Sequence, residues 1–173
     1  AALAARKVKV RVLTNSLAAT DVSAVHAGYA KHRKFMLESG IELYELRRTA
    51  TDGTKRKASI FGGSSASSLH AKTFAVDDAR MFVGSFNFDP RSAKLNTELG
   101  FVIDSPVLAR NVADLFADAV PTISYQVQLS SSGKLQWIER REGTTVIHDS
   151  EPETSFLQRA WIGLLSILPI DWL

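Results

Sequence analysis

Hydrophobic and polar residues follow two different periods in the first part of the chain. Residues 8–13 alternate valine with basic residues, which predicts a strand that ends in a polar loop. From residue 20 to 39 apolar positions recur about every 3.6 residues and Gly40 follows, so a helix is predicted there. Residues 41–46 predict a second strand. This order indicates a βαβ unit with parallel strands.

Further apolar runs of strand length lie at residues 69–76, 81–85, 99–103, 125–129 and 135–140. The first two flank a polar turn at residues 77–80 and the last two flank residues 130–134, so each pair predicts a hairpin. Ser105 followed by Pro106 is typical of a helix start. A helix with an apolar face through residue 119 is therefore predicted.

The composition fits one domain without disulfides or a metal centre. The 173 residues are 45% apolar, which is enough for a single globular domain over residues 1–173. The absence of cysteine excludes disulfides and thiolate zinc sites, and no two of the four histidines stand at a short metal-ligand spacing. We expect no metal and no cofactor. The net charge of +3 gives only weak support for an anionic partner.

The two ends of the chain are apolar. Residues 1–5 favour helix but are too few to form one alone, so we interpret them as the tail of a helix in a longer protein, with a frayed terminus as the alternative. No signal peptide is visible, and no apolar run reaches the roughly 18–20 residues of a membrane span. Residues 156–173 form a hydrophobic C-terminal segment with two tryptophans. It either lies along a membrane interface or packs in the core or against a missing domain; both stay open.

Residues 47–68 predict a long loop. Its first part is basic and its second part consists of small residues. Such a loop is either a solvated surface or a site that recruits anionic headgroups.

The first predicted hairpin brings candidate catalytic residues together. With the turn centred in residues 77–80, Lys72 would lie opposite Ser85 and His70 opposite Asn87. Because residues two apart on a strand share a face, all four side chains would project from one end of the hairpin. A change of one residue in the turn would break this arrangement.

These side chains suit the chemistry of a phosphodiester. Lys72 supplies a positive charge, and Ser85 and Asn87 supply hydrogen-bond donors for phosphate oxygens. The His70 imidazole could attack phosphorus and form a covalent intermediate, which gives a two-step reaction. A carboxylate should orient the imidazole by accepting its other N–H, and Glu98 is the candidate.

Asp77 is expected to have a different role. Seven residues of extended chain would separate it from His70 by roughly 20 Å. We predict that Asp77, with Arg80 as its partner, holds the turn and does not touch the substrate.

The residues stand at fixed spacings, in the order His70-x-Lys72-x4-Asp77-x6-Gly84-Ser85-x-Asn87. This series resembles the complete signature of the phospholipase D superfamily. Residues 13–21, 26–29, 87–100 and 164–173 are similar to its bacterial cardiolipin synthase branch, and in particular to the C-type enzymes. The resemblance spans nearly the whole chain.

The resemblance implies an α/β fold: a phospholipase D-like three-layer α-β-α sandwich with a mixed sheet, one half of a pseudo-two-fold pair. Family members carry two such motifs; one histidine attacks phosphorus, the other protonates the leaving alcohol, and no metal is needed. His70 would be one of that pair, and Lys72 and Asn87 would bind phosphate with Ser85 beside them. Glu98 would orient His70. Gly84, like Asp77, would be structural.

Only one motif is present, so the resemblance implies a partner. This chain would be the C-terminal half of a longer protein whose N-terminal half carries the second motif, or two copies would pair through the active-site face. His26 would lie near the substrate entrance, although a surface histidine is an equal alternative. Arg91, just after Asn87, is a candidate for a second phosphate contact. His32 and His148 are expected to be structural or solvated.

Three functions are compatible with the sequence. The first is transfer of a phosphatidyl group between phospholipids to make cardiolipin, by a peripheral protein at the cytoplasmic face of the bacterial inner membrane. The second is a superfamily nuclease or phospholipase; the hydrophobic C-terminus and the lack of a basic stripe with interleaved aromatics argue against nucleic acid as a partner. The third is an isolated half-domain that is inactive alone.

Overall fold

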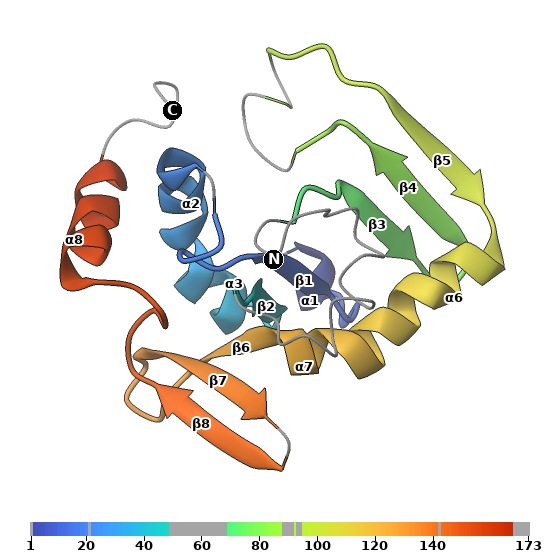
Figure 1. The fold of residues 1–173 in the computed structure, drawn as a ribbon. Coiled ribbons are helices and arrows are strands. Elements are labelled where there is room, and N and C mark those ends of the chain that lie inside the picture. The colour runs from blue at the N-terminus through green and yellow to red at the C-terminus, as the bar shows by residue number, and fades with distance from the viewer. Residues whose placement is uncertain are drawn as a thin grey trace.

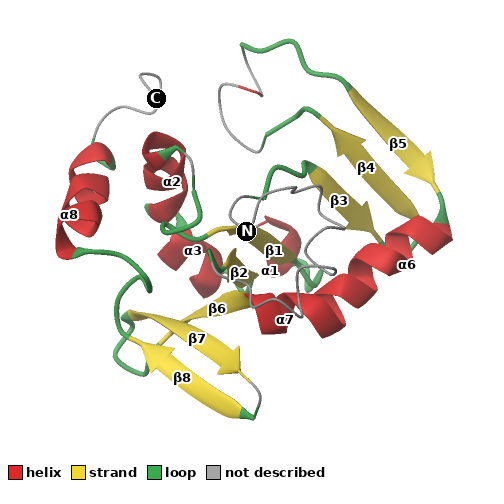
Figure 2. Ribbon diagram, viewed as in Figure 1, coloured by secondary structure: helices red, strands yellow, loops and turns green. Residues whose placement is uncertain are grey.

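The computed structural model describes residues 2–20, 22–48, 69–87, 92, 95–141 and 143–167. The strands are β1 (Arg11–Asn15), β2 (Glu42–Leu46), β3 (Thr73–Val76), β4 (Arg80–Gly84), β5 (Gly100–Asp104), β6 (Ser124–Leu129), β7 (Leu135–Arg141) and β8 (Thr144–His148). The helices are α1 (Ala2–Ala5), α2 (Ser23–Ala30), α3 (Arg33–Glu38), α6 (Pro106–Asp114), the π-helix η3 (Leu115–Ala119), α7 (Val120–Ile123) and α8 (Phe156–Leu165). Figures 1 and 2 show their arrangement.

The larger sheet is mixed, in the order β1-β2-β6-β7-β8. Strands β1 and β2 are parallel, which confirms the predicted βαβ unit, and the remaining pairs are antiparallel. The predicted helix over residues 20–39 is divided into α2 and α3 by a turn at Lys31 and His32. The β6–β7 hairpin is as predicted, whereas β8 was not foreseen. The α/β class with a mixed sheet is thus confirmed.

The core of this sheet lies under α2 and α3. Leu43, Tyr125, Val127 and Trp137 are buried together on one face of β2, β6 and β7. Tyr29, Met36 and Leu37 of the two helices pack against them. Burial of these apolar side chains is the main force that holds the helices on the sheet.

Buried charges reinforce the same contact. Arg33 on α3 is 3% exposed, and its Nε lies 2.8 Å from Oε1 of Glu45, which is 0% exposed. Its guanidinium also pairs with Glu151 and lies over the rings of Tyr29 and Trp137. Arg33 therefore neutralises carboxylates that could not remain buried alone.

The smaller sheet has the order β3-β4-β5, and all its pairs are antiparallel. The continuous run of α6, η3 and α7 connects it to the larger sheet (Figure 1). Helix α6 begins as predicted: the Ser105 side chain accepts a hydrogen bond from the Leu108 N–H, and Pro106 occupies the first turn. This cap fixes where the chain turns back across β3 and β4.

The register of the β3–β4 hairpin differs from the predicted one. Val76 pairs with Arg80, so that Lys72 lies opposite Gly84 and not opposite Ser85; the Gly84 N–H donates to the Lys72 carbonyl at 3.2 Å. The turn is one residue shorter than expected because Asp77 and Asp78 both adopt positive φ, 52° and 48°. Aspartate tolerates this left-handed region better than most residues. The hairpin ladder alone therefore does not place the four predicted side chains on one face.

Helix α8 ends the described part of the chain and packs beside α2 (Figure 1). Ser155 and Gln158 form a capping box at its start, and Ile162 is buried against Leu17 and Ala27. Among the described residues, no helix has the length and hydropathy needed to cross a membrane. Residues 168–173 of the predicted C-terminal segment lie outside the described part.

Candidate active site

The candidate site lies at one edge of the smaller sheet, where β4 ends and β3 and β5 begin. His70 and Lys72 lead into β3, Ser85 and Asn87 follow β4, and Glu98 precedes β5. Because β3 and β5 run antiparallel to β4, all three connections reach the same edge. The structure describes five predicted residues at this end of the sheet: His70, Lys72, Ser85, Asn87 and Glu98. Arg91 lies outside the described residues.

His70 and Lys72 form the first side of the site. His70 is exposed, so its imidazole is accessible to a substrate. Lys72 is half-buried, and its Nζ donates a hydrogen bond to the His70 carbonyl at 3.2 Å. The ammonium group is therefore held within a few ångströms of the histidine backbone, where it can bind an anion.

Ser85 and Glu98 form the second side. The Ser85 hydroxyl donates to Glu98 Oε2 at 2.5 Å and accepts a hydrogen bond from the Leu99 N–H at 3.0 Å. The Ser85 N–H in turn donates to the Leu99 carbonyl at 2.8 Å. Ser85 thus joins the ends of β4 and β5 and brings the carboxylate to the site, although the strand register differs from the predicted one.

The Glu98 carboxylate is stabilised in its ionised form. The hydrogen bond from Ser85 is the main reason why the pKa of Glu98 lies below its usual value, and hydrogen bonds from Ser92 and Asn96 and the positive charge of Lys72 add to it. Among the described residues, the hydrogen bonds of this carboxylate go to these side chains and not to His70. The orientation of His70 by Glu98 stays a prediction.

Gly84 is required by close packing at this edge. A Cβ at this position would lie 2.5 Å from the Leu99 carbonyl oxygen and 2.7 Å from the Gly100 Cα, both of which are backbone atoms. The Phe82 ring lies within 2.8 Å of the same point. Any other residue would push β5 away from β4 and move Ser85 from its partner.

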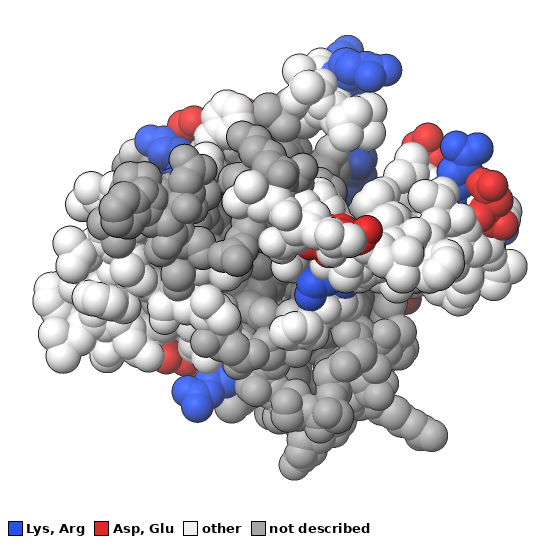
Figure 3. Space-filling view, turned by 90° about the horizontal axis from the view of Figure 1, so that it is seen from above, with Lys and Arg blue, Asp and Glu red and all other residues white. Residues whose placement is uncertain are grey.

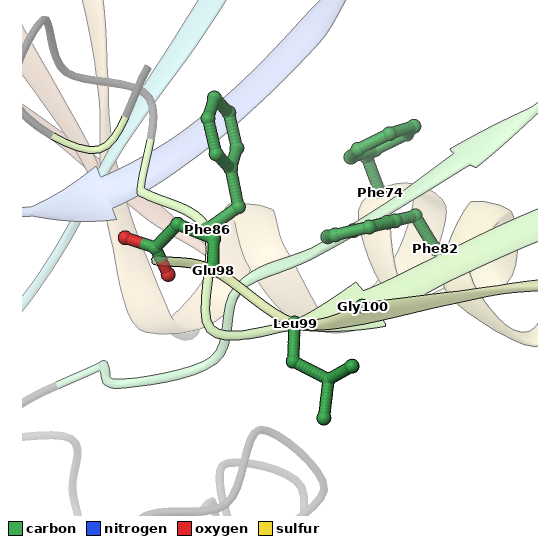
Figure 4. A pocket seen from close by; sticks show the side chains of 6 residues that line it. All are labelled: Phe74, Phe82, Phe86, Glu98, Leu99 and Gly100. Carbon is green, nitrogen blue, oxygen red and sulfur yellow. The ribbon is translucent and has the colours of Figure 1, made fainter. Parts of the chain in front are cut away.

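An open cavity of about 320 Å³ adjoins the carboxylate. Phe74 and Phe82 stack with their ring centroids 4.8 Å apart, and Phe86, Glu98 and Leu99 complete most of the wall (Figure 4). The site therefore has an apolar surface directly beside its charged residues.

Asp77 and its expected partner are separated. Asp77 is exposed in the turn at the opposite end of the hairpin, as predicted from its distance to His70. Arg80 pairs with Asp104 on β5, with 2.6 Å between Nε and Oδ1, and so the expected Asp77–Arg80 pair was wrong. The ladder places Arg80 directly opposite Asp104, which explains this choice.

His26 lies in the interior and not at a surface entrance. It is 3% exposed, and its Nε2 lies 2.6 Å from an Arg33 amino nitrogen and 3.3 Å from Glu151 Oε1. The buried side of α2 carries it to the charged network under that helix. His148 is also structural, with Nε2 3.0 Å from Glu139 Oε2, whereas His32 is exposed.

Asn87 is exposed beyond the end of β4, and no hydrogen bond connects it to the other site residues in the described part of the chain. One residue at this site that the sequence did not point to is Asn96, which donates to Glu98 Oε1 at 3.3 Å. Its signal was the run of polar residues directly before β5. No group of three or more histidine, aspartate or glutamate side chains in the described residues could hold a metal ion.

Comparison with known proteins identifies the family. The family described as "Cardiolipin synthase, PLD-like domain" matches residues 1–120, which include the candidate site. The chain belongs to this family. Its predicted membership of the phospholipase D superfamily and its cardiolipin synthase branch is confirmed.

Several relatives of this PLD-like domain extend well beyond it. Cardiolipin synthase C of Escherichia coli (strain K12) is 47% identical over 166 residues, which are 96% of this chain and 35% of that protein. An uncharacterized protein of Helicobacter pylori (strain J99) is 34% identical over 163 residues, or 94% of this chain and 31% of that protein. A cardiolipin synthase of Staphylococcus aureus (strain Mu50) is 32% identical over 75 residues, 43% of this chain and 15% of that protein.

The chain spans about a third of the length of the first two of these relatives, at 35% and 31%. No solved structure matches it.

Proposed function

We propose that this PLD-like domain supplies one half-site of a phosphatidyltransferase that makes cardiolipin. The observation that carries the proposal is the exposed His70 next to Lys72, at the same sheet edge as the Ser85–Glu98 pair. Similarity to Cardiolipin synthase C supports a lipid phosphodiester as the substrate. The aromatic cavity beside Glu98 supports a substrate with an apolar part.

The proposed reaction has two steps. A His70 ring nitrogen attacks phosphorus, a P–N bond forms, and the P–O bond to the first alcohol breaks; that alcohol leaves with a proton supplied by the second half-site. The hydroxyl of a second lipid then attacks phosphorus, loses its proton to the same group, and breaks the P–N bond. Water in place of that hydroxyl gives hydrolysis. The opposite assignment, with His70 as the acid, uses the same residues.

The other side chains stabilise charge on the phosphate. Lys72 supplies a cation and Ser85 and Asn87 supply donors to its oxygens. Glu98 would hold the His70 ring by accepting a hydrogen bond from its second ring N–H. This N–H would compete for the carboxylate with the Ser85 hydroxyl, which donates to Glu98 in the structure. A shared carboxylate of this kind would let substrate binding release Ser85 toward the phosphate.

The second half-site would come from an N-terminal half with its own motif or from a second copy of this chain. Exposed apolar side chains on β5 and before it support a covering partner: Leu99 is 69%, Phe101 62% and Val102 69% exposed. Single exposed apolar residues are ordinary on a protein surface, but Leu99 and Phe101 stand two positions apart and so share a face next to the site, which is typical of an interface.

The protein would work as a peripheral protein on the cytoplasmic face of a bacterial inner membrane. Helix α8 supports this because its outward side is its apolar side: Leu157 is 76%, Trp161 54% and Leu164 58% exposed. A helix on a water-exposed surface usually turns charged residues outward. Apolar residues with tryptophan suit the headgroup boundary of a bilayer.

A superfamily nuclease is the second candidate, and no specific observation favours it. Among the described residues on the face seen in Figure 3, the basic side chains are scattered and do not form a stripe. Binding along a nucleic-acid backbone would need such a stripe.

The test is a lipid-transfer assay on the full-length protein with phosphatidylglycerol vesicles and, in parallel, duplex DNA. His70→Ala should lower kcat by at least about a thousandfold and Lys72→Met by about a hundredfold, whereas exposed His32→Ala should leave kcat unchanged. Retained lipid transfer in His70→Ala would contradict the assigned role of His70. Cleavage of DNA without lipid turnover would establish the nuclease instead.

The isolated 173-residue chain is expected to be inactive as a monomer. If two copies form the site, specific activity should increase with protein concentration and follow the dimer fraction measured by sedimentation. Full turnover by a monomer, independent of concentration, would rule out the half-site.

A further inference from the structure

Asn15 makes two hydrogen bonds to the backbone of the residue directly before His70. It is the last residue of β1. Its Nδ2 donates to the Leu69 carbonyl at 3.1 Å, and its Oδ1 accepts the Leu69 N–H at 2.7 Å. Both contacts are partly buried and bridge 54 positions of sequence. They connect the end of the larger sheet to the segment that enters the smaller one.

The two bonds fix the backbone on both sides of the Leu69 Cα. Leu69 and His70 precede β3, so no strand ladder satisfies their polar groups. The carbonyl of Leu69 and the N–H of His70 belong to one planar peptide group. A hydrogen bond to that carbonyl therefore fixes the orientation of the peptide group that leads into His70. On the other side, Lys72 Nζ holds the His70 carbonyl at 3.2 Å.

We infer that Asn15 is a positioning residue that sets the place of the His70 imidazole. The inference rests on the proposed function, in which His70 reacts with phosphorus. An asparagine amide can donate and accept at once toward one residue's backbone; an aspartate carboxylate keeps only the bond to the Leu69 N–H, and a leucine of similar size keeps neither. A shift of about 1 Å in a reacting group can cost about a hundredfold in rate.

The experiment compares Asn15→Leu and Asn15→Asp in the full-length protein, with phosphatidylglycerol vesicles as substrate. Asn15→Leu should lower kcat by about 10- to 100-fold and change KM by less than about twofold, because the substrate-binding side chains remain. Asn15→Asp, which keeps one bond, should give a kcat between that of Asn15→Leu and wild type. Activities are expressed per folded molecule, from circular dichroism at the assay temperature.

Asn111 provides the matched control, since it is an exposed asparagine on α6. Asn111→Leu and Asn111→Asp should keep the wild-type kcat. An unchanged kcat in Asn15→Leu, or a loss fully explained by a smaller folded fraction, would overturn the positioning role. Failure of the proposed function itself is recognised separately, because His70→Ala would then retain turnover.

Discussion

The Ser85 hydroxyl donates to Glu98 Oε2 at 2.5 Å and joins the end of β4 to the residues before β5. Ser85 belongs to the Gly84-Ser85-x-Asn87 part of the motif. Because it binds Glu98 in the protein without substrate, its hydroxyl has a structural role before any substrate is bound. It favours the ionised carboxylate and is the main cause of the low pKa of Glu98. The same hydroxyl is a donor for phosphate in the proposed reaction.

Replacement of Ser85 by alanine should therefore raise the pKa of Glu98 toward its usual value. The native fold favours ionised Glu98, so its contribution to stability is present above the unfolded pKa and disappears as the pH falls through the folded pKa. In Ser85→Ala the contribution should be smaller and disappear at higher pH. Carboxyl carbon NMR titration measures the pKa. Ser130→Ala, in the distant β6–β7 turn, should leave it unchanged, and an unshifted pKa in Ser85→Ala would contradict this assignment.

Sequence reasoning placed the site residues on the right hairpin but in the wrong register. The hydrophobic pattern shows where β3 and β4 lie, yet it fixes the pairing only through the turn, and a turn of three or four residues fits the same pattern. The positive φ angles of Asp77 and Asp78 select the three-residue turn. Nothing in the pattern of apolar residues reports those angles.

Contacts between distant segments were the other part that the sequence could not predict. The cap of α6 was predictable because Ser105 and Pro106 are adjacent. The buried Arg33–Glu151 pair and the Asn15–Leu69 contact join residues far apart in the chain, and arginine, glutamate and asparagine are all more common on a surface. Only the fold brings such partners together.

The close approach at Gly84 leads to a prediction about stability. Gly84→Ala should destabilise the protein by about 1–3 kcal/mol, because its Cβ would lie 2.5 Å from the Leu99 carbonyl oxygen and backbone atoms cannot easily move away. Gly28→Ala on α2 is the matched control. Outside the neighbouring residues and the backbone of α2 itself, no atom lies within 4 Å of that Cβ, so alanine should stabilise the helix by about 0.5–1 kcal/mol. Urea denaturation measures both, and equal effects of the two substitutions would contradict the close packing.

Arg33 should be one of the most sensitive positions for folding. Arg33→Met leaves the buried carboxylates of Glu45 and Glu151 without their cation and should cost about 3–5 kcal/mol. Burial alone would raise the pKa of Glu151, but hydrogen bonding to His26 and the charge of Arg33 outweigh it and hold that pKa below its usual value.

The control for Arg33 is its neighbour. Lys34 pairs with Glu38 at 3.8 Å on the exposed side of α3, and Lys34→Met should cost less than about 0.5 kcal/mol. The free energy of unfolding in urea distinguishes the two. A loss of less than about 1 kcal/mol in Arg33→Met would show that the buried network contributes little.

The outward face of α8 gives the test of membrane binding. Trp161→Ala combined with Leu164→Ala removes two exposed apolar side chains and leaves buried Ile162 in place, so the fold should remain. Each side chain of this size contributes about 1.5–3 kcal/mol when it leaves water, and the double variant should therefore bind phosphatidylglycerol vesicles at least about tenfold more weakly in sedimentation assays.

Phe35→Ala is the matched control, because Phe35 is an equally exposed apolar residue, at 58%, on α3. It should bind vesicles like the wild type, and so should His70→Ala, since the proposed chemistry at His70 and the proposed membrane contact of α8 use different surfaces. If the α8 variant binds vesicles normally but loses self-association or contact with another part of the protein, this face is covered by protein. The apolar side of α8 would then belong to an interface between domains and not to the membrane surface.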